Sequence, residues 1–560
     1  MMNRPWLKNY PPGIPAEINA DQYHNLWQMI EETLHKYSSL TAFSCMGKSL
    51  TFAEINQKSL AMAAFLQSKG LKRGDKVAIM MPNLLQYPIA LFACLRAGLV
   101  VVNTNPLYTP REMRHQFADS DATAIIICEN FASHLQEVLP DTKIKTVVVT
   151  SIGELLGLKG LMVNFVVRKV KKMVPAFSIP GAISFSDALK EGKKHTLAPL
   201  QSDPEDVIIL QYTGGTTGVS KGAMLTNRNL VANMLQNRAI MMPYLKEAEG
   251  TALCCLPLYH IFAFTVNCLT LMGAGIENIL VTNARDIESV AKEFKNNRIT
   301  VFTGVNTLFN ALLNNPTFQS ADFKSLKITV GGAMAVQRAV AERWKEVTGC
   351  VLAEGYGLTE SSPVASCNPL DGSGKIGTIG LPVPSTDFRI MSEEGQVLGF
   401  EETGEIQIKG PQVMKGYYKK PEDTARSILE GWLCTGDIGV MSEDGFIRIV
   451  DRKKDMILVS GFNVYPNEIE DVIAMMPGVL EVAAIGVADE KSGELPKVFI
   501  VKKDPQLTEE QVIAHCRENL TNYKIPRYIE FRSELPKTNV GKILRRHLRD
   551  EEAAKQAGNS

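Results

Sequence analysis

The feature that most constrains the fold is a repeated alternation of helix and strand patterns that begins at Thr51. Thr51 and Glu54 form a capping box ahead of a helix with apolar periodicity, and Thr109, Pro110 and Glu112 mark a second helix start. Apolar runs suited to strands lie at residues 76–81, 99–102, 124–128 and 146–149. Because repeated strand and helix alternation builds a parallel sheet covered by helices, the sequence predicts an α/β fold.

A run rich in glycine and hydroxyl side chains follows the apolar segment 207–210. Its members are Tyr212, Thr213, Gly214, Gly215, Thr216, Thr217, Gly218, Val219, Ser220, Lys221 and Gly222. Glycines can adopt positive φ and let backbone N–H groups close around an anion, while the hydroxyls and Lys221 add donors and positive charge. We therefore expect a buried strand that leads into a polyphosphate-binding loop.

Two better-known motifs do not fit this run. A Walker loop ending at Lys221 would need glycine at Ser220 and a serine or threonine at Gly222. The residues from Gly218 to Gly222 do satisfy G-x-S-x-G, but a nucleophilic serine of that type stands on a turn directly after its strand. Here residues 213–217 intervene, so we do not expect Ser220 to be a nucleophile.

Length and composition exclude several classes of protein. The 560 residues exceed what one hydrophobic core usually serves, so at least two domains are expected. The 60 basic and 60 acidic side chains cancel and give no indication of a nucleic-acid partner. Ten cysteines without a C-x-x-C pair suit reduced thiols in a cytoplasmic protein, and residues 1–18 lack the apolar run of a secretory signal.

Two apolar segments need separate interpretations. Residues 252–276 carry no formal charge and could span a bilayer, but Pro257 and several polar residues interrupt them, which favours a core or ligand-lining segment. Within it, His260 is either structural or part of a pocket. Residues 155–174 interleave apolar and basic side chains, and two interpretations stay open: a helix on an anionic membrane surface, or a solvated helix with a buried apolar stripe.

Two further motifs, taken with the loop, resemble the adenylate-forming superfamily of acyl-CoA synthetases, luciferases and nonribosomal adenylation domains. They are Glu354-Gly355-Tyr356-Gly357-Leu358-Thr359-Glu360 and the block 431–439 with its continuation 451–455. The resemblance runs from about Thr51 to Arg546 and is greatest to bacterial long-chain fatty acid CoA ligases. Cys434, Met441 and Glu443 depart from the usual pattern of that subfamily.

The resemblance implies roles for individual residues. Catalytic roles fall to Lys542, Thr213 and Glu360, and Glu360 would hold Mg²⁺. The ATP phosphates would be bound by Thr213, Gly214, Gly215, Thr216, Thr217, Gly218, Ser220, Lys221 and Gly222. The adenylate would be bound by Gly332, Gly355, Tyr356, Gly357, Thr359, Asp437 and Arg452. The acyl pocket would be lined by His260, Phe262, Gly304, Gly331 and Gly357. The hinge and coenzyme A face would include Asp451, Ser460, Gly461 and Phe462.

The same resemblance implies a domain plan and a reaction. We expect a large N-terminal multi-sheet α/β domain, residues 1–450, and a small mobile C-terminal α+β domain, residues 451–560, which carries Lys542 and swings about Asp451. The expected reaction uses ATP to convert a long-chain fatty acid to an acyl-adenylate and then transfers the acyl group to coenzyme A. In acetate-activating relatives a tryptophan blocks the pocket at the position of Gly357, so glycine here leaves room for a chain.

Alternatives remain open at this point. The chain could activate an aryl acid, or load a carrier protein in place of free coenzyme A. A lipid-binding scaffold without catalysis is disfavoured because Lys221, Glu360, Asp437, Arg452 and Lys542 are all present. We further expect a cytoplasmic homodimer with small-molecule substrates, no nucleic acid, and peripheral contact with the inner face of the cell membrane.

Overall fold

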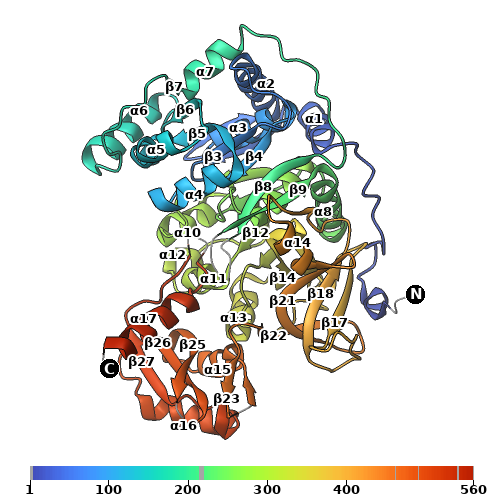
Figure 1. The fold of residues 1–560 in the computed structure, drawn as a ribbon, viewed down its shortest axis with the longest axis vertical. Coiled ribbons are helices and arrows are strands. Elements are labelled where there is room, and N and C mark those ends of the chain that lie inside the picture. The colour runs from blue at the N-terminus through green and yellow to red at the C-terminus, as the bar shows by residue number, and fades with distance from the viewer. Residues whose placement is uncertain (1–3, 214–219, 461, 490, 539–540, 559–560) are drawn as a thin grey trace.

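The computed structural model describes residues 4–213, 220–460, 462–489, 491–538 and 541–558, with side chains to residue 555. Within these residues four β-sheets organise the chain, three in the body and one in a smaller C-terminal unit (Figure 1). The C-terminal unit lies at one end of the molecule, below α11 and α13 in the view of Figure 1. The predicted α/β class, with several sheets and a smaller C-terminal part, is therefore confirmed.

The first sheet has eight strands in the order β19-β9-β8-β4-β3-β5-β6-β7. The strands are β3 Lys76–Met80, β4 Val100–Asn103, β5 Ala122–Cys128, β6 Thr146–Thr150, β7 Ile183–Ser184, β8 Val207–Thr213, β9 Lys221–Thr226 and β19 Gly416–Tyr417. Its helices are α2 Phe52–Ser68, α3 Gln86–Arg96, α4 Pro110–Ser120, α5 Ala132–Val138 and α7 Phe185–Gly192. Strands β3 to β8 pair in parallel, as the alternation predicted, whereas β9 and β19 add antiparallel pairs at one edge.

The second sheet has nine strands in the order β16-β15-β14-β13-β12-β10-β11-β1-β2. The strands are β1 Thr41–Cys45, β2 Lys48–Thr51, β10 Thr251–Cys254, β11 Glu277–Leu280, β12 Val301–Gly304, β13 Ile328–Gly331, β14 Leu352–Gly357, β15 Val364–Cys367 and β16 Leu381–Pro382. Its helices are α1 Leu26–Lys36, α8 Asn227–Met241, α10 Ile287–Asn296, α11 Asn306–Leu313, α12 Pro316–Gln319 and α13 Arg338–Thr348. The six central strands are parallel, so their carboxyl ends share one edge.

The third and fourth sheets are mainly antiparallel. The third contains β17 Asp387–Met391, β18 Gly404–Lys409, β20 Ile428–Leu429, β21 Trp432–Met441 and β22 Ile447–Arg452, with α14 Pro421–Ser427 beside it. The fourth contains β23 Ile457–Val459, β24 Phe462–Val464, β25 Val479–Asp489, β26 Gly493–Lys502 and β27 Tyr528–Arg532. Its helices are α15 Pro466–Ala474, α16 Glu509–Asn519 and α17 Arg545–Gly558. This last sheet packs against cores of its own, but the exact division after residue 450 stays a prediction.

Local sequence signals explain where several helices start. Both predicted capping boxes are present: Thr51 accepts a hydrogen bond from the Glu54 backbone at the start of α2, and Thr109 accepts one from Glu112 at the start of α4. Each glutamate returns a bond to its cap residue, so two orphan N–H groups are satisfied at each helix start. These signals predicted element starts to within a residue or two.

The uncharged segment 252–276 lies in the core, as expected. It forms β10, the short helix α9 Ile261–Ala263 and the π-helix η6 Phe264–Leu271, whose residues are all buried. Its polar side chains find partners there, since Thr303 Oγ1 donates to Asn267 Oδ1 at 2.9 Å. Among the described residues, none of the helices combines the length and apolarity that crossing a membrane requires.

Candidate active site

The carboxyl ends of β12, β13 and β14 bring several predicted site residues to one edge. Gly304 pairs with Gly331, and Gly331 pairs with Glu354. Aromatic rings explain why glycine is needed here: a Cβ on Gly304 would lie 2.9 Å from the Phe309 ring, and one on Gly332 would lie 2.9 Å from the Phe262 ring. Gly304 and Gly331 therefore lie side by side at this edge, with the Phe309 and Phe262 rings packed against the backbone of Gly304 and Gly332; their role as an acyl pocket stays a prediction.

His260 lies at the start of α9, on the chain that leaves β10. Its Nδ1 accepts a long hydrogen bond, 3.4 Å, from the Phe262 backbone, so the ring caps the helix. Burial, followed by the positive charge of Lys542, lowers the pKa of His260 to about 4. The imidazole is therefore neutral at neutral pH, and it lies near enough to Lys542 to sense its charge.

A cluster of buried polar groups forms what we call the ribose end of the site: Tyr356, Asp437 and Arg452. Asp437 is 2% exposed and pairs with Arg452 across β21 and β22. Arg452 Nε lies 3.2 Å from Asp437 Oδ1, and the Tyr356 hydroxyl donates to Asp437 Oδ2 at 2.6 Å. Burial and the Asp437 charge raise the pKa of Tyr356 well above its ordinary value, which keeps this hydroxyl a donor. Three of the predicted adenylate residues thus form one connected unit.

A second cluster, the phosphate end, contains Lys221, Glu360, Tyr417 and Asp423. Lys221 begins β9 directly opposite Thr213 at the end of β8, so both flank the glycine-rich loop. Lys221 Nζ lies 2.7 Å from Asp423 Oδ1 and 5.4 Å from the centre of the Tyr417 ring. The Tyr417 hydroxyl in turn donates to Glu360 Oε1 at 2.7 Å. Glu360 and Thr359 stand in the short turn after β14.

The loop itself is only partly described. Gly214, Gly215, Thr216, Thr217 and Gly218 were predicted to bind phosphate and lie outside the described residues, as does Gly461 of the predicted coenzyme A face. Of its neighbours, Ser220 accepts a hydrogen bond at its carbonyl from His115 Nε2 at 3.0 Å, in the ring form that carries the proton there. A Cβ on Gly222 would lie 3.1 Å from the Tyr212 ring, so this glycine allows close packing of the hairpin.

Lys542 reaches this region from the C-terminal unit. Its backbone is held in a turn in which its N–H donates to Thr538 Oγ1 at 3.1 Å and the Thr538 N–H donates to its carbonyl at 2.7 Å. The preceding residue, Gly541, has a φ of +82° and its carbonyl accepts a bond from Thr307 Oγ1 on α11 at 3.4 Å. This contact ties the turn to the body of the molecule.

The electrostatic surroundings of Lys542 are unusual for a lysine. Burial, followed by the charge of Arg452, lowers its pKa to about 7. Asp437 acts in the opposite sense and His260 lies near the same ammonium group. A lysine with a pKa near neutrality where two structural units meet is a candidate functional group, and added anions would restore its charge.

Gly355 and Gly357 lie where β14 pairs with β15. A Cβ on Gly357 would lie 1.9 Å from the Pro363 carbonyl oxygen, so close backbone approach requires glycine there. This is a second reason for glycine, besides the predicted room for an acyl chain, which stays a prediction. Gly355 is less tightly confined, with 3.3 Å to Val330 Cγ1.

The predicted hinge and coenzyme A residues are not gathered around Lys542. Asp451 is fully buried at the end of β22, where Arg545 and the Asn467 backbone contact its carboxylate, and burial raises its pKa to about 6. Phe462 is 56% exposed and stacks on Tyr523, with ring centres 4.8 Å apart. Ser460 is also exposed, with a φ of +51°. Among the described contacts, none joins Ser460 or Phe462 to the ribose or phosphate ends.

Sequence reasoning missed four residues that shape the site: Thr307, Tyr417, Asp423 and Arg545. Tyr417 reaches the site because β19 pairs with β9, and Asp423 reaches it on α14. No local spacing in the sequence predicts either contact. Arg545 looks like part of a solvated basic tail, yet its guanidinium pairs with Asp451, Asp455 and Glu470. The only available signal was the sharp concentration of charge around residues 451–455.

Comparison with known proteins agrees with this geometry. Residues 30–418 match the family model for the AMP-binding enzyme, and residues 468–542 match that for the AMP-binding enzyme C-terminal domain. A long-chain-fatty-acid–CoA ligase from Escherichia coli O6:H1 is 54% identical, with 99% of both chains covered, and one from Bacillus subtilis is 39% identical, with 98% of both covered. The solved structure of an anthranilate CoA ligase in complex with anthranoyl-AMP matches with a TM-score of 0.86 at 25% identity, covering 96% of this chain and all of that one.

Proposed function

We propose that this chain, which belongs to the AMP-binding enzyme family, joins a long-chain fatty acid to coenzyme A at the expense of ATP. A carboxylate oxygen of the acid attacks the α-phosphorus of ATP, and pyrophosphate leaves with the electrons of the broken P–O bond. The thiol sulfur of coenzyme A then attacks the acyl carbon, its proton is lost, and AMP leaves. The observation that carries the proposal is Lys542, whose charge acts on His260 and is acted on by Arg452 and Asp437 of the ribose end.

The ribose end suits the nucleotide. Asp437 has Arg452 on one carboxylate oxygen and Tyr356 on the other, so its orientation is fixed before any ligand arrives. A fixed carboxylate can accept hydrogen bonds from two ribose hydroxyls without reorganising. We assign Gly332, Gly355, Gly357 and Thr359 to the surroundings of the same adenylate.

Positive charge is the main contribution to the first step. Both reactants are anions, so the approach of a carboxylate to ATP is opposed until nearby cations offset the repulsion. Lys221 supplies one cation beside the glycine-rich loop and Lys542 supplies another from the C-terminal unit. Binding of anions raises the pKa of Lys542, which charges the ammonium when it is needed.

Glu360 is the residue that would hold Mg²⁺. Its carboxylate offers the oxygen ligand that this hard cation prefers, and the Tyr417 bond engages Oε1 and leaves Oε2 for a further ligand. When bound, the cation would neutralise charge on the pyrophosphate leaving group. Thr213, across the hairpin from Lys221, adds a hydroxyl at the same end of the site.

The long-chain preference takes its support from the relatives, since those at 54% and 39% identity both carry that name. The apolar edge formed by Phe262, Gly304 and Gly331, together with His260 and Gly357, is our candidate for the acyl pocket. Each methylene buried there would contribute about 0.8 kcal/mol, so an open pocket favours longer acids.

We also propose that the C-terminal unit moves between the two half-reactions. In the orientation described here Lys542 faces the body, whereas Ser460 and Phe462 are exposed. Rotation about Asp451 would withdraw Lys542 and present these residues, with Gly461, to coenzyme A. A few residues at the end of a strand are sufficient to absorb such a rotation.

We also propose a cellular setting for the protein. A cytoplasmic homodimer that touches the inner face of the cell membrane would suit an enzyme whose substrate partitions into lipid. Retention of the purified protein on anionic vesicles tests the membrane contact, and sedimentation tests the dimer.

The first experiment is ATP-dependent thioester formation with free coenzyme A across saturated acids from acetate to palmitate, with AMP measured in parallel. We expect AMP and thioester to rise together and to peak at long chains. If none of these acids is activated, the substrate belongs to another class, for which an aryl acid is the first candidate. AMP or adenylate without free thioester would retain the first step and redirect the acyl group to a carrier protein.

A further inference from the structure

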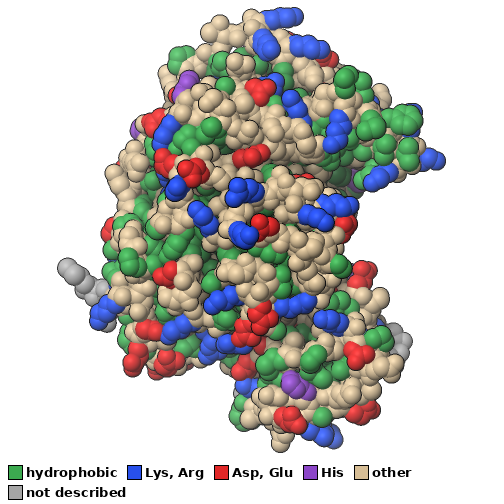
Figure 2. Space-filling model, turned by 180° about the vertical axis from the view of Figure 1, so that it is seen from behind, with side chains coloured by type: hydrophobic (Ala, Val, Ile, Leu, Met, Phe, Trp, Pro, Cys, Tyr) green, Lys and Arg blue, Asp and Glu red, His purple; other side chains and the backbone are tan. Residues whose placement is uncertain are grey.

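The segment 158–173 carries the densest group of exposed apolar side chains among the described residues. It consists of α6 Leu158–Phe165 and the π-helical turn η4 Val166–Val170, followed by three residues. The exposed fractions are 88% for Leu158, 70% for Leu161, 62% for Met162, 61% for Phe165, 64% for Val170 and 51% for Met173. We call these six side chains the apolar ridge. In Figure 2 a green projection with blue side chains around it stands out where α6 lies in Figure 1 after the half-turn.

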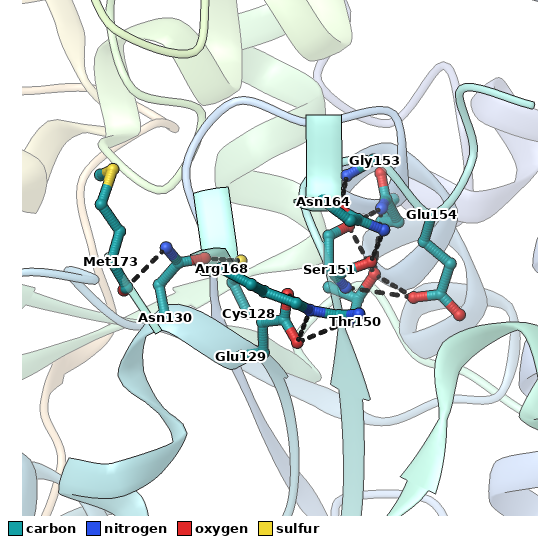
Figure 3. Close-up of polar contacts among 11 residues, drawn as sticks. Cys128, Glu129, Asn130, Thr150, Ser151, Gly153, Glu154, Asn164, Arg168 and Met173 are labelled. Carbon is teal, nitrogen blue, oxygen red and sulfur yellow. Dashed lines mark hydrogen bonds and ion pairs between the residues drawn. The ribbon is translucent and has the colours of Figure 1, made fainter. Parts of the chain in front are cut away.

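The inward face of the segment explains why the ridge points outward. A Cβ on Gly160 would lie 1.8 Å from the Gly153 carbonyl oxygen, so the helix touches the body through bare backbone. Asn164 then accepts a bond from the Gly153 N–H at 2.8 Å and donates to Ser151 Oγ at 2.9 Å (Figure 3). The inward side of the segment thus combines Gly160 and Asn164 with a short apolar stripe, Val163 and Val167, while the six side chains of the ridge point outward.

A half-buried ion pair and a hydrogen bond to the backbone fix the far end of the segment. Arg168 forms a bidentate ion pair with Glu129, in which Arg168 Nη2 lies 2.8 Å from Glu129 Oε2. The Glu129 side chain is 8% exposed. Asn130 Nδ2 donates to the Met173 carbonyl at 3.1 Å (Figure 3). The segment does bury a short apolar stripe, Val163 and Val167, but it also exposes the six side chains of the ridge, so vesicle binding decides between the two interpretations that the sequence left open.

The charged side chains of the segment itself are all basic. No aspartate or glutamate occurs from residue 155 to residue 186, in a chain whose total charge is zero. Lys169, Lys171 and Lys172 are exposed, and among the described carboxylates none pairs with them. A second copy of this chain docked ridge to ridge would bring lysines against lysines. A surface that matches this ridge has anionic groups at its boundary, which pair with the lysines, and an apolar interior, which receives the apolar side chains.

We propose that the apolar ridge inserts into the headgroup boundary of an anionic lipid bilayer while Lys169, Lys171 and Lys172 contact lipid phosphates. This deepens the proposed function, since the ridge would hold the enzyme at the surface that contains its long-chain acid. Apolar burial and attraction to anionic lipid both contribute to such interfacial binding.

The test is flotation of the full-length chain, without ATP or coenzyme A, on vesicles of phosphatidylglycerol mixed with phosphatidylcholine and on phosphatidylcholine alone. Reversal of Lys169, Lys171 and Lys172 to glutamate should weaken binding to the anionic vesicles about a hundredfold or more. The matched control reverses Lys324, Lys327 and Lys345, which are exposed on another part of the body, and should leave binding nearly unchanged.

A second variant removes apolar surface and keeps the charge. Leu161→Ser with Phe165→Ser should weaken vesicle binding roughly tenfold or more, and Val397→Ser with Leu429→Ser is its matched control, with exposures of 61% and 47%. Thioester formation from a short, water-soluble acid should be unchanged in both variants, which shows that they are folded and separates this inference from the proposed function. Unchanged vesicle binding, or a loss of dimers in sedimentation without a change in vesicle binding, would overturn the proposal.

Discussion

The two ends of the candidate site differ in what their charged groups do before a ligand arrives. At the ribose end, Asp437 is buried and its two oxygens are directed by Arg452 and Tyr356. At the phosphate end, Lys221 and Asp423 form an ion pair in which both side chains are about 30% exposed. Glu360 is likewise engaged by Tyr417.

The ribose end is preorganised for its ligand, whereas at the phosphate end an internal ion pair competes with the ligand. The contacts of Asp437 hold its carboxylate in place and can persist when a ribose binds. The pairing of Lys221 with Asp423 uses the same positive charge that a phosphate would need, so it must be exchanged on binding. Substitutions at the ribose end should therefore cost much, whereas a substitution at the phosphate end can improve binding.

The largest effect is expected from Lys542→Ala, which removes the cation that the C-terminal unit brings to the ribose end. Adenylate formation should fall by about 10³-fold or more, because a preorganised charge in a water-poor site contributes strongly to the transition state. Thioester formation from supplied acyl-adenylate should be spared, because Lys542 would be withdrawn in that step. Single-turnover assays of each half-reaction measure both rates.

The control for Lys542→Ala is Lys503→Ala, an exposed lysine of the same C-terminal unit. It should leave both half-reactions unchanged. Equal loss of the two half-reactions in Lys542→Ala would contradict the two-orientation account and would make Lys542 a general structural or binding residue.

Asp437→Asn comes next and breaks the ribose end directly. The substitution keeps the shape of the side chain but removes the charge opposite Arg452 and turns one acceptor into a donor facing the Tyr356 hydroxyl. We expect kcat/KM for ATP to fall by roughly a hundredfold, mainly through KM, since hydrogen bonds to charged groups contribute about 1.5–3 kcal/mol. Asp444→Asn, in the turn between β21 and β22, where the half-exposed carboxylate pairs with Lys375 and not with the ribose end, is the matched control, and a loss confined to kcat would argue against a ribose role.

Above the pKa of Lys542, kcat/KM for adenylate formation is expected to fall tenfold per pH unit. The pKa of about 7 means that the ammonium of the free enzyme is lost as the pH rises above 7. Since the charged form is the active one, kcat/KM for adenylate formation should be flat below pH 7 and fall above it, while the fall in kcat occurs at higher pH because bound anions hold the proton. Lys542→Arg, which cannot titrate in this range, should lose the fall, and an identical profile in that variant would remove Lys542 as its source.

The sequence predicted the helices and strands better than it predicted the side-chain contacts between them. Strand and helix alternation and the Thr51 and Thr109 capping boxes act over a few residues, so their outcome was confirmed nearly residue by residue. The ordered motifs likewise predicted that Tyr356, Asp437 and Arg452 belong to one site. That assignment came from the resemblance, and the contacts among the three side chains are a finding of the structure.

Two apolar segments show where sequence reasoning reached its limit. The uncharged residues 252–276 were rightly placed in the core, because polar interruptions excluded a membrane span. For residues 155–174 periodicity could not decide which stripe faces inward. The inward face is set by contacts of Asn164 and Arg168 with Gly153 and Glu129. Gly153 and Glu129 lie outside the segment in the sequence and become its neighbours only in the fold. The same holds for Asp423, which reaches Lys221 from a helix about 200 residues away in the chain.

The smallest effect is expected from Asp423→Asn, and its sign is the sharpest test of the comparison. Exposed ion pairs contribute up to about 1 kcal/mol, so release of Lys221 should lower KM for ATP by up to roughly fivefold and leave kcat unchanged. Glu422→Gln, one residue earlier on α14 and paired only with exposed Arg426, is the matched control and should do nothing. A rise in KM for Asp423→Asn would mean that Asp423 positions Lys221 for phosphate, in which case the phosphate end is as preorganised as the ribose end and the contrast between them disappears.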